Sequence, residues 1–151
     1  MILRDANIDD AEGLDKLLSK LVREESQYDD NLNPNCEILD NYRYRIGLEG
    51  HKLLIIEEKG EIIGYLYGFV YHIPGIYEAP IAILDALFIG EEHRRKGYAS
   101  MLISEFKKFA TDNGAKQIEL KVLSNNSVAL KLYEKLSFVE TKKYMKMVIR
   151  D

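Results

Sequence analysis

An apolar run followed by a short basic loop and an amphipathic segment constrains the fold of this chain more than any other feature. The run spans residues 81–89, the loop reads Arg-Arg-Lys-Gly over residues 94–97, and apolar residues then recur with helical spacing from Ala99 to Ala110. This change of period is typical of a buried strand followed by a helix. The sequence therefore predicts a strand-loop-helix unit in the second half of the chain.

The start of the predicted helix has the properties of an anion-binding site. The first N–H groups of a helix lack internal partners, and the helix dipole places partial positive charge beside them. Arg94, Arg95 and Lys96 add full charges, and Gly97 lets a ligand oxygen approach the backbone closely. Phosphate binding is one interpretation of this loop, and a solvated basic connection is the other.

Hydrophobic periodicity predicts strands and helices in alternation along the rest of the chain. Strands are expected at about 2–4, 52–57, 61–71, 81–89, 115–122, 138–141 and 144–149, and helices at about 7–25, 38–46, 97–113 and 127–136. This order predicts an α/β fold in one domain over residues 1–151. We expect a mixed, mostly antiparallel central sheet of six to seven strands, with about four helices on both faces.

Two spaced motifs resemble those of the GNAT superfamily of acyl-CoA-dependent N-acyltransferases. Arg94-x-x-Gly97-x-Ala99 is similar to its Q/R-x-x-G-x-G/A signature. Asn126-x-x-Ala129-x-x-x-Tyr133-x-x-x-Ser137-Phe138 is similar to its N-x-x-A-x-x-x-Y-x-x-x-G-F pattern. The expected order of elements also matches the family over nearly the whole chain. The resemblance implies the GNAT fold and an N-acetyltransferase that uses acetyl-CoA.

The resemblance also implies where acetyl-CoA would bind. In the family the basic loop and first helical turn hold the pyrophosphate, and the main chain of the preceding strand holds the acetyl and pantetheine portions. The asparagine and tyrosine of the second motif also contact the coenzyme. The coenzyme-binding residues expected on this basis are Leu87, Phe88, Ile89, Arg94, Arg95, Lys96, Gly97, Tyr98, Ala99, Ser100, Asn126 and Tyr133. No metal is expected.

Two side chains are candidates for proton transfer. Asp85 interrupts an apolar strand, where a charge is costly unless it has a partner or a task. By resemblance to the polyamine-acetyltransferase branch it would accept the proton of the amine, directly or through water; the alternative is a structural role at a bulge or beside a cation. Tyr133 is implied to protonate the coenzyme thiolate, and the alternative is a half-buried core tyrosine.

Ser137 departs from the family pattern, which has glycine before phenylalanine. Glycine there allows a left-handed end to the helix, and serine adopts that conformation at a cost of about 1 kcal/mol. We expect a slightly strained turn at Ser137 and retained function.

The acceptor is expected to be a primary amine. Acidic residues crowd the first 40 positions, and Tyr28, Asp29 and Asp85 are the expected acceptor-binding residues. A polyamine-like or aminoglycoside-like amine, or a protein lysine or N-terminal amine, would suit aromatic and acidic groups. Solvation of a helix end is the simpler interpretation of the acidic residues.

Acylation of Cys36 is an alternative mechanism, although no histidine is placed by sequence to activate it. A noncatalytic acyl-CoA-binding scaffold is the alternative function.

Composition excludes several other classes. The net charge of −4 argues against nonspecific nucleic-acid binding, and a single cysteine rules out an internal disulfide or a multi-thiolate metal site. Neither a signal peptide nor a membrane-spanning run is recognisable. A cytoplasmic protein is expected, and the family resemblance adds a possible homodimer.

Overall fold

The structure, a computed structural model, describes residues 1–150. Contacts divide the chain into two compact units, Met1–Lys121 and the segment from Val122 onward, and each is described by itself. The first unit contains strands β1 (Ile2–Asp5), β2 (His51–Glu58), β3 (Glu61–Tyr71), β4 (Ile81–Ile89) and β5 (Ile118–Glu119). It also contains the helices α1 (Ala11–Glu25) and α2 (Tyr98–Asp112), preceded by the 3-10 turns η1 (Ile8–Asp10) and η2 (Glu91–His93). The second unit contains α3 (Ser127–Lys135).

The five strands form one sheet in the order β1-β2-β3-β4-β5. Each of the first four strands pairs antiparallel with its neighbour, and β5 pairs parallel with β4. The predicted hairpin is confirmed: β2 and β3 meet at Lys59 and Gly60, both of which have positive φ. The mixed, mostly antiparallel sheet expected from the sequence is therefore present.

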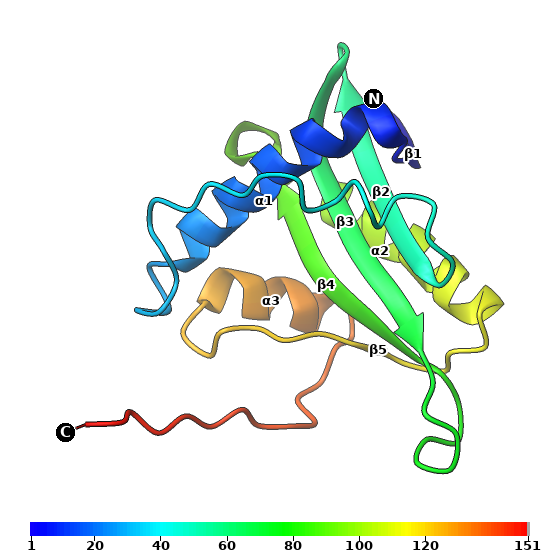
Figure 1. Ribbon diagram of the computed structural model, residues 1–151, viewed down its shortest axis with the longest axis vertical. Helices are drawn as coiled ribbons and strands as arrows, with labels where there is room; N and C mark the ends of the chain where they lie inside the picture. The colour runs from blue at the N-terminus through cyan, green and yellow to red at the C-terminus, as the bar shows by residue number, and fades with distance from the viewer. Residues whose placement is uncertain (151) are drawn as a thin grey trace. The chain divides into compact units, whose positions relative to one another are not determined.

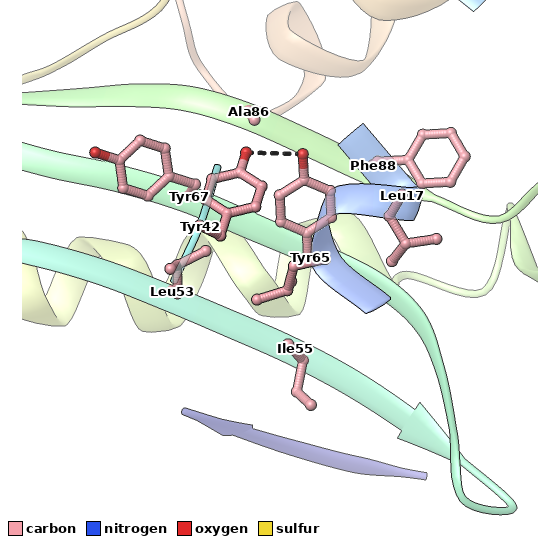
Figure 2. Close-up of a cluster of buried hydrophobic side chains, with 9 residues drawn as sticks. Leu17, Tyr42, Leu53, Ile55, Tyr65, Tyr67, Ala86 and Phe88 are labelled. Atoms are coloured by element: carbon pink, nitrogen blue, oxygen red, sulfur yellow. Dashed lines mark hydrogen bonds between the residues drawn. The ribbon is translucent and has the colours of Figure 1, made fainter. Parts of the chain in front are cut away.

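Helices α1 and α2 cover opposite faces of this sheet (Figure 1). The α1 face is a cluster of buried side chains, which we call the tyrosine cluster (Figure 2): Leu14, Leu17, Tyr42, Leu53, Ile55, Tyr65, Tyr67, Ala86 and Phe88. On the other face, α2 buries Leu102, Phe106 and Ala110. Gly68 makes room there, since a Cβ at this position would lie 2.4 Å from the Phe106 ring.

The predicted helix over residues 38–46 is wrong, because α1 side chains bind the backbone N–H groups of this segment. The carboxylate of Asp15 accepts the N–H groups of Asn41 and Tyr42 at 3.2 and 3.0 Å. The Ser19 hydroxyl accepts the N–H of Ile38 at 2.9 Å. The segment forms turns instead, and Asp40 has a φ of 56° that no right-handed helix contains.

The expected count of six to seven strands is also wrong, because the sheet of the described residues has five. Residues 138–141 and 144–149 were expected to be strands but form none, and β5 is only two residues long. A strand exists only when a neighbour accepts its hydrogen bonds, so residues with a preference for strands do not produce one by themselves. There are three α-helices rather than about four.

Candidate functional site

Asp85 is the extra residue of a β-bulge in β4. In the pairing of β3 with β4, Tyr67 lies opposite Ala86. The next residue of β3, Gly68, lies opposite Leu84, so Asp85 is skipped. Leu84 and Ala86 are buried, whereas Asp85 is exposed. The bulge thus lets an otherwise apolar strand present a carboxylate to solvent.

The bulge also reverses which side of β4 each backbone group faces. The N–H of Ala82 donates to the carbonyl of Gln117 beside β5, at 3.3 Å. The N–H of Gly90 donates to Ile63 of β3, at 2.8 Å. In a regular strand, residues an even number apart direct their N–H groups toward the same neighbouring strand. Ala82 and Gly90 are an even number apart but donate to opposite sides of β4, so one extra residue must lie between them. That residue is Asp85.

Past the bulge, Leu87 and Ile89 direct their backbone N–H groups away from β3. β5 pairs with β4 only at Ala82 and Ile83, and no other strand of residues 1–150 pairs with that edge. The edge can accept an extended ligand through main-chain hydrogen bonds, as expected for pantetheine. The backbone of Phe88, by contrast, faces its partner Tyr65 on β3.

The loop between β4 and α2 presents backbone N–H groups beside two exposed cations. Arg95 and Gly97 have φ values of 63° and 82°, and Gly97 directly precedes α2 without a side-chain cap. A left-handed conformation is uncommon for arginine, and alternation of this kind turns successive N–H groups toward a common point where an anion can bind. Arg95 and Lys96 are exposed. The start of α2, with Tyr98, Ala99 and Ser100, thus has the chemistry of a phosphate site.

The side chain of Arg94 contacts groups of the protein. Its Nη2 donates to both carboxylate oxygens of Glu24 on α1 at 2.9 Å, and its Nε donates to the carbonyl of Ile89 at 2.8 Å. Its guanidinium carbon lies 5.5 Å from the centroid of the Phe88 ring. Arg94 therefore fastens the basic loop to α1 and to the end of β4.

Tyr98 anchors the other end of the loop. Its hydroxyl donates to Oε1 of Glu58 at 2.7 Å, and Nδ1 of His93 lies 3.4 Å from Oε2 of the same carboxylate. This hydrogen bond raises the pKa of Tyr98 and lowers the pKa of Glu58, and the nearby charges of Lys96 and His93 lower the latter further. The loop is thus held at both ends by side chains that the motif itself does not include.

On the α1 face, Asp85 lies close to three tyrosines of the tyrosine cluster. The hydroxyls of Tyr42 and Tyr65 are hydrogen-bonded at 2.9 Å (Figure 2), and the hydroxyl of Tyr67 is bonded to Nδ1 of His51 at 2.7 Å. Burial raises the pKa of each of these tyrosines, and the charge of Asp85 contributes to each rise. An exposed carboxylate therefore lies close to a buried group of tyrosines.

The other expected acceptor residues lie in the turn that follows α1. Tyr28 donates its N–H to the carbonyl of Glu25 at 2.9 Å, and the carboxylate of Asp29 accepts the N–H of Asn31 at 2.9 Å. Burial raises the pKa of Glu25, and the charges of Glu24 and Asp29 raise it further. Asp29 therefore belongs to an acidic group at the end of α1. Cys36 is a half-buried free thiol.

The second unit carries the Asn126–Phe138 motif. Asn126 caps α3, since its side-chain oxygen accepts the N–H of Ala129 at 3.2 Å. Tyr133 lies on α3 and packs edge-to-face against Phe138, with ring centroids 5.7 Å apart. Ser137 has a φ of 72°, so the expected left-handed helix end is confirmed.

Sequence reasoning missed three features of this site. Glu24 is the partner of Arg94 but lies 70 residues away, and no local pattern relates them. Glu58 lies at the end of β2, beside the hairpin turn, and accepts the hydrogen bond of Tyr98. Arg45 lies in the turns of residues 38–46 and binds Asn41. The hairpin signal at Lys59 and Gly60 could have suggested that Glu58 meets another element.

Two other features are absent from residues 1–150. No three histidine, cysteine, aspartate or glutamate side chains gather in a way that could hold a metal ion. Every helix in this part of the chain is too short or too polar to cross a membrane.

Comparison with known proteins gives consistent matches. The sequence model of the family described as "Acetyltransferase (GNAT) family" matches residues 17–138. The uncharacterized N-acetyltransferase YhfO of Bacillus subtilis is 36% identical over 95 residues. That match spans 62% of this chain and 63% of YhfO, which is less than two thirds of the relative's length.

Two solved structures share the fold. A mutant of the BH1408 protein from Bacillus halodurans superposes with a TM-score of 0.88 at 19% identity, over 99% of this chain and 100% of that one. The aminoglycoside N-acetyltransferase AAC(6')-Iy in complex with CoA superposes with a TM-score of 0.75 at 19% identity, over 99% of this chain and 100% of that one. At this identity the likeness concerns the fold alone.

Proposed function

The chain belongs to the GNAT acetyltransferase family, and from this we propose that it transfers an acetyl group from acetyl-CoA to a primary amine. The observation that carries the proposal is the open edge of β4 beside the basic loop. Leu87 and Ile89 offer N–H groups there, and the loop offers N–H groups and cations at the start of α2. A ligand with an amide-containing arm and a pyrophosphate fits these groups.

Acetyl-CoA supplies an activated thioester when it is bound. We propose that the pantetheine portion of the coenzyme binds the backbone N–H groups of Leu87 and Ile89. The pyrophosphate then binds the N–H groups and cations of residues 95–100. Arg94 remains an expected coenzyme-binding residue, and we assign it a positioning role as well, since its guanidinium binds Glu24 and Ile89. Asn126 caps α3, and in this proposal it orients the helix that carries Tyr133.

The proposed reaction is direct transfer between two bound substrates. The nitrogen of the amine forms a bond with the acetyl carbon, and the bond from that carbon to sulfur breaks. Asp85, or a water on it, takes the proton that the nitrogen loses. Tyr133 donates its hydroxyl proton to the departing sulfur. Because Tyr133 lies in the second unit, this assignment requires both units to act as one domain, which is part of the proposal.

The acceptor class rests on Asp85, the exposed carboxylate close to the buried tyrosine cluster. An exposed carboxylate suits an ammonium group before it loses its proton. Polyamines, aminoglycosides and the amines of peptides all contain such a group. Tyr28 and Asp29 remain expected acceptor residues, located in the turn after α1.

Substitution of Tyr133 by phenylalanine tests the proposed acid. General acid catalysis contributes roughly 100-fold to 10,000-fold, so Tyr133→Phe should lower kcat by about 100-fold or more while coenzyme A still binds. The measurements are steady-state rates and calorimetric binding of coenzyme A. Tyr144→Phe is the matched control, because Tyr144 is an exposed tyrosine of the same unit.

A Tyr133→Phe protein with unchanged kcat would contradict the assignment. A protein that binds coenzyme A and shows no transferase activity with any amine, before or after substitution, would support the noncatalytic alternative.

A further inference from the structure

Arg45 places a cation on the face of the sheet that also carries Asp85. Its Nη1 donates to the backbone carbonyl of Asn41 at 2.7 Å and to its side-chain oxygen at 3.0 Å. The guanidinium carbon lies 5.7 Å from the centroid of the Tyr67 ring. Among residues 1–150, no carboxylate forms an ion pair with Arg45. This half-buried guanidinium is therefore fixed in position without a neutralising partner.

Tyr67 lies close to both Arg45 and Asp85. Its cross-strand partner is Ala86, the residue next to the bulged Asp85, and Arg45 covers its ring. The electrostatics agree with this placement: burial raises the pKa of Tyr67, Arg45 opposes the rise and Asp85 adds to it. Two opposite charges thus lie beside one aromatic ring and are not paired with each other.

The segment that carries Arg45 is held in place before any ligand arrives. Asp15 and Ser19 of α1 bind the backbone at Ile38, Asn41 and Tyr42. Tyr42 is buried within the tyrosine cluster (Figure 2). A charged group that is already positioned loses little conformational freedom on binding, so less of its favourable interaction with the ligand is offset by the entropic cost of ordering it.

We propose that the acceptor is a primary amine that also carries a carboxylate, as an amino acid does, with its amine at Asp85 and its carboxylate on Arg45. The inference rests on the proposed function and narrows its substrate class. The guanidinium fork matches the two oxygens of a carboxylate. The same cation repels acceptors that carry only positive charges, such as polyamines and aminoglycosides.

The first test uses the unmodified protein and pairs of acceptors that differ only in the carboxylate. Glycine, 4-aminobutyrate, 6-aminohexanoate, lysine and phenylalanine are each compared with their carboxamides, and spermidine and kanamycin are included as purely cationic acceptors. For at least one pair, kcat/KM should be roughly 10- to 100-fold higher for the carboxylate, the range expected for a charge-assisted hydrogen bond. The length of the preferred acid reports the spacing of the two charges.

The second test removes the cation. Arg45→Gln should abolish the preference for carboxylate over carboxamide, and Asp85→Asn should slow both members of a pair by the same factor. Arg43→Gln is the matched control, because Arg43 lies two residues away, is exposed and pairs with Asp40. The acceptor series on the unmodified protein stands even if Arg45→Gln folds poorly.

Several results would overturn the proposal. One is turnover of the carboxamides, spermidine or kanamycin at least as fast as the acids. Another is an Arg45→Gln protein that loses the same factor with acids and with carboxamides. Either result leaves the acetyltransferase activity itself intact. If acetyl-CoA bound and no amine of the panel reacted, the proposed function would fail as well, so the two failures can be told apart.

Discussion

The Arg94 side chain contacts three groups that belong to different parts of the first unit. It binds Glu24 at the end of α1, the carbonyl of Ile89 at the end of β4, and the face of the Phe88 ring. By its place in the motif, Arg94 was expected to bind the coenzyme. Its contacts add a role in positioning the basic loop, so the loop depends on a residue of α1.

Glu24→Gln tests this role. Loss of the carboxylate removes an ion pair whose side chains are about 40% exposed, and such pairs contribute modestly. We expect the Kd for coenzyme A to rise about two- to fivefold by calorimetry, while kcat at saturating coenzyme changes little. Glu12→Gln is the control, because Glu12 lies on the same helix and pairs with Lys16 in solvent. Equal affinities for the two variants would contradict a positioning role for Glu24.

The start of α1 depends on one buried carboxylate. Asp10 is 8% exposed and accepts two hydrogen bonds from Arg4, at 2.8 and 3.1 Å. It also accepts the N–H of Asn7 at 2.8 Å, which completes a capping box before the helix. The hydrogen bonds from Arg4 have the largest effect, and together with that from Asn7 they lower the pKa of Asp10 below its ordinary value of 3.8. They join β1 to α1.

Asp10→Asn should therefore destabilise the protein in a pH-dependent way. Because folding lowers the pKa of Asp10, its ionised form stabilises the folded state above its ordinary pKa, and this contribution is lost as the pH falls through the folded-state value. We expect a loss of about 1–3 kcal/mol at pH 7, measured by urea unfolding. The difference between the two proteins should shrink below pH 3.8. A difference that is as large at pH 3 as at pH 7 would argue that the charge of Asp10 is unimportant.

The elements that could be predicted from sequence are those whose own residues decide their structure. β3 and β4 begin and end where the pattern placed them, since long apolar runs identify central strands. Ser137 was expected to be left-handed because the family has glycine there, and its φ is 72°. By contrast, residues 38–46 have a helical pattern, but Asp15 and Ser19 of α1 compete for their backbone N–H groups. Tertiary hydrogen bonds of that kind leave no local signal.

The candidate site likewise has parts that the local sequence predicts and parts that depend on tertiary contacts. The basic loop and the carboxylate in β4 are visible in the sequence because a motif or an odd residue in an apolar run reveals them. The pairing of Arg94 with Glu24 and the placement of Arg45 over Tyr67 depend on how distant segments pack. The bulge that exposes Asp85 is a matter of register between two strands, which hydrophobicity alone does not specify.

Taken as a whole, the first unit offers two kinds of surface connected by β4. Its open edge and the adjoining loop suit the coenzyme, and the exposed carboxylate at the bulge suits the amine. In the proposed reaction, the second unit contributes Tyr133. That reaction needs all three, so the central claim concerns both units rather than any single residue.

The release of coenzyme A from acetyl-CoA, measured with and without a primary amine, tests that claim most directly. We predict that release depends on the amine, with little release in its absence. Gly97→Glu is the control, because Gly97 is left-handed and a carboxylate beside the phosphate site would repel the coenzyme, so this variant should lose both binding and release. Tight binding of acetyl-CoA to the unmodified chain, with no amine able to increase coenzyme A release, would contradict the account.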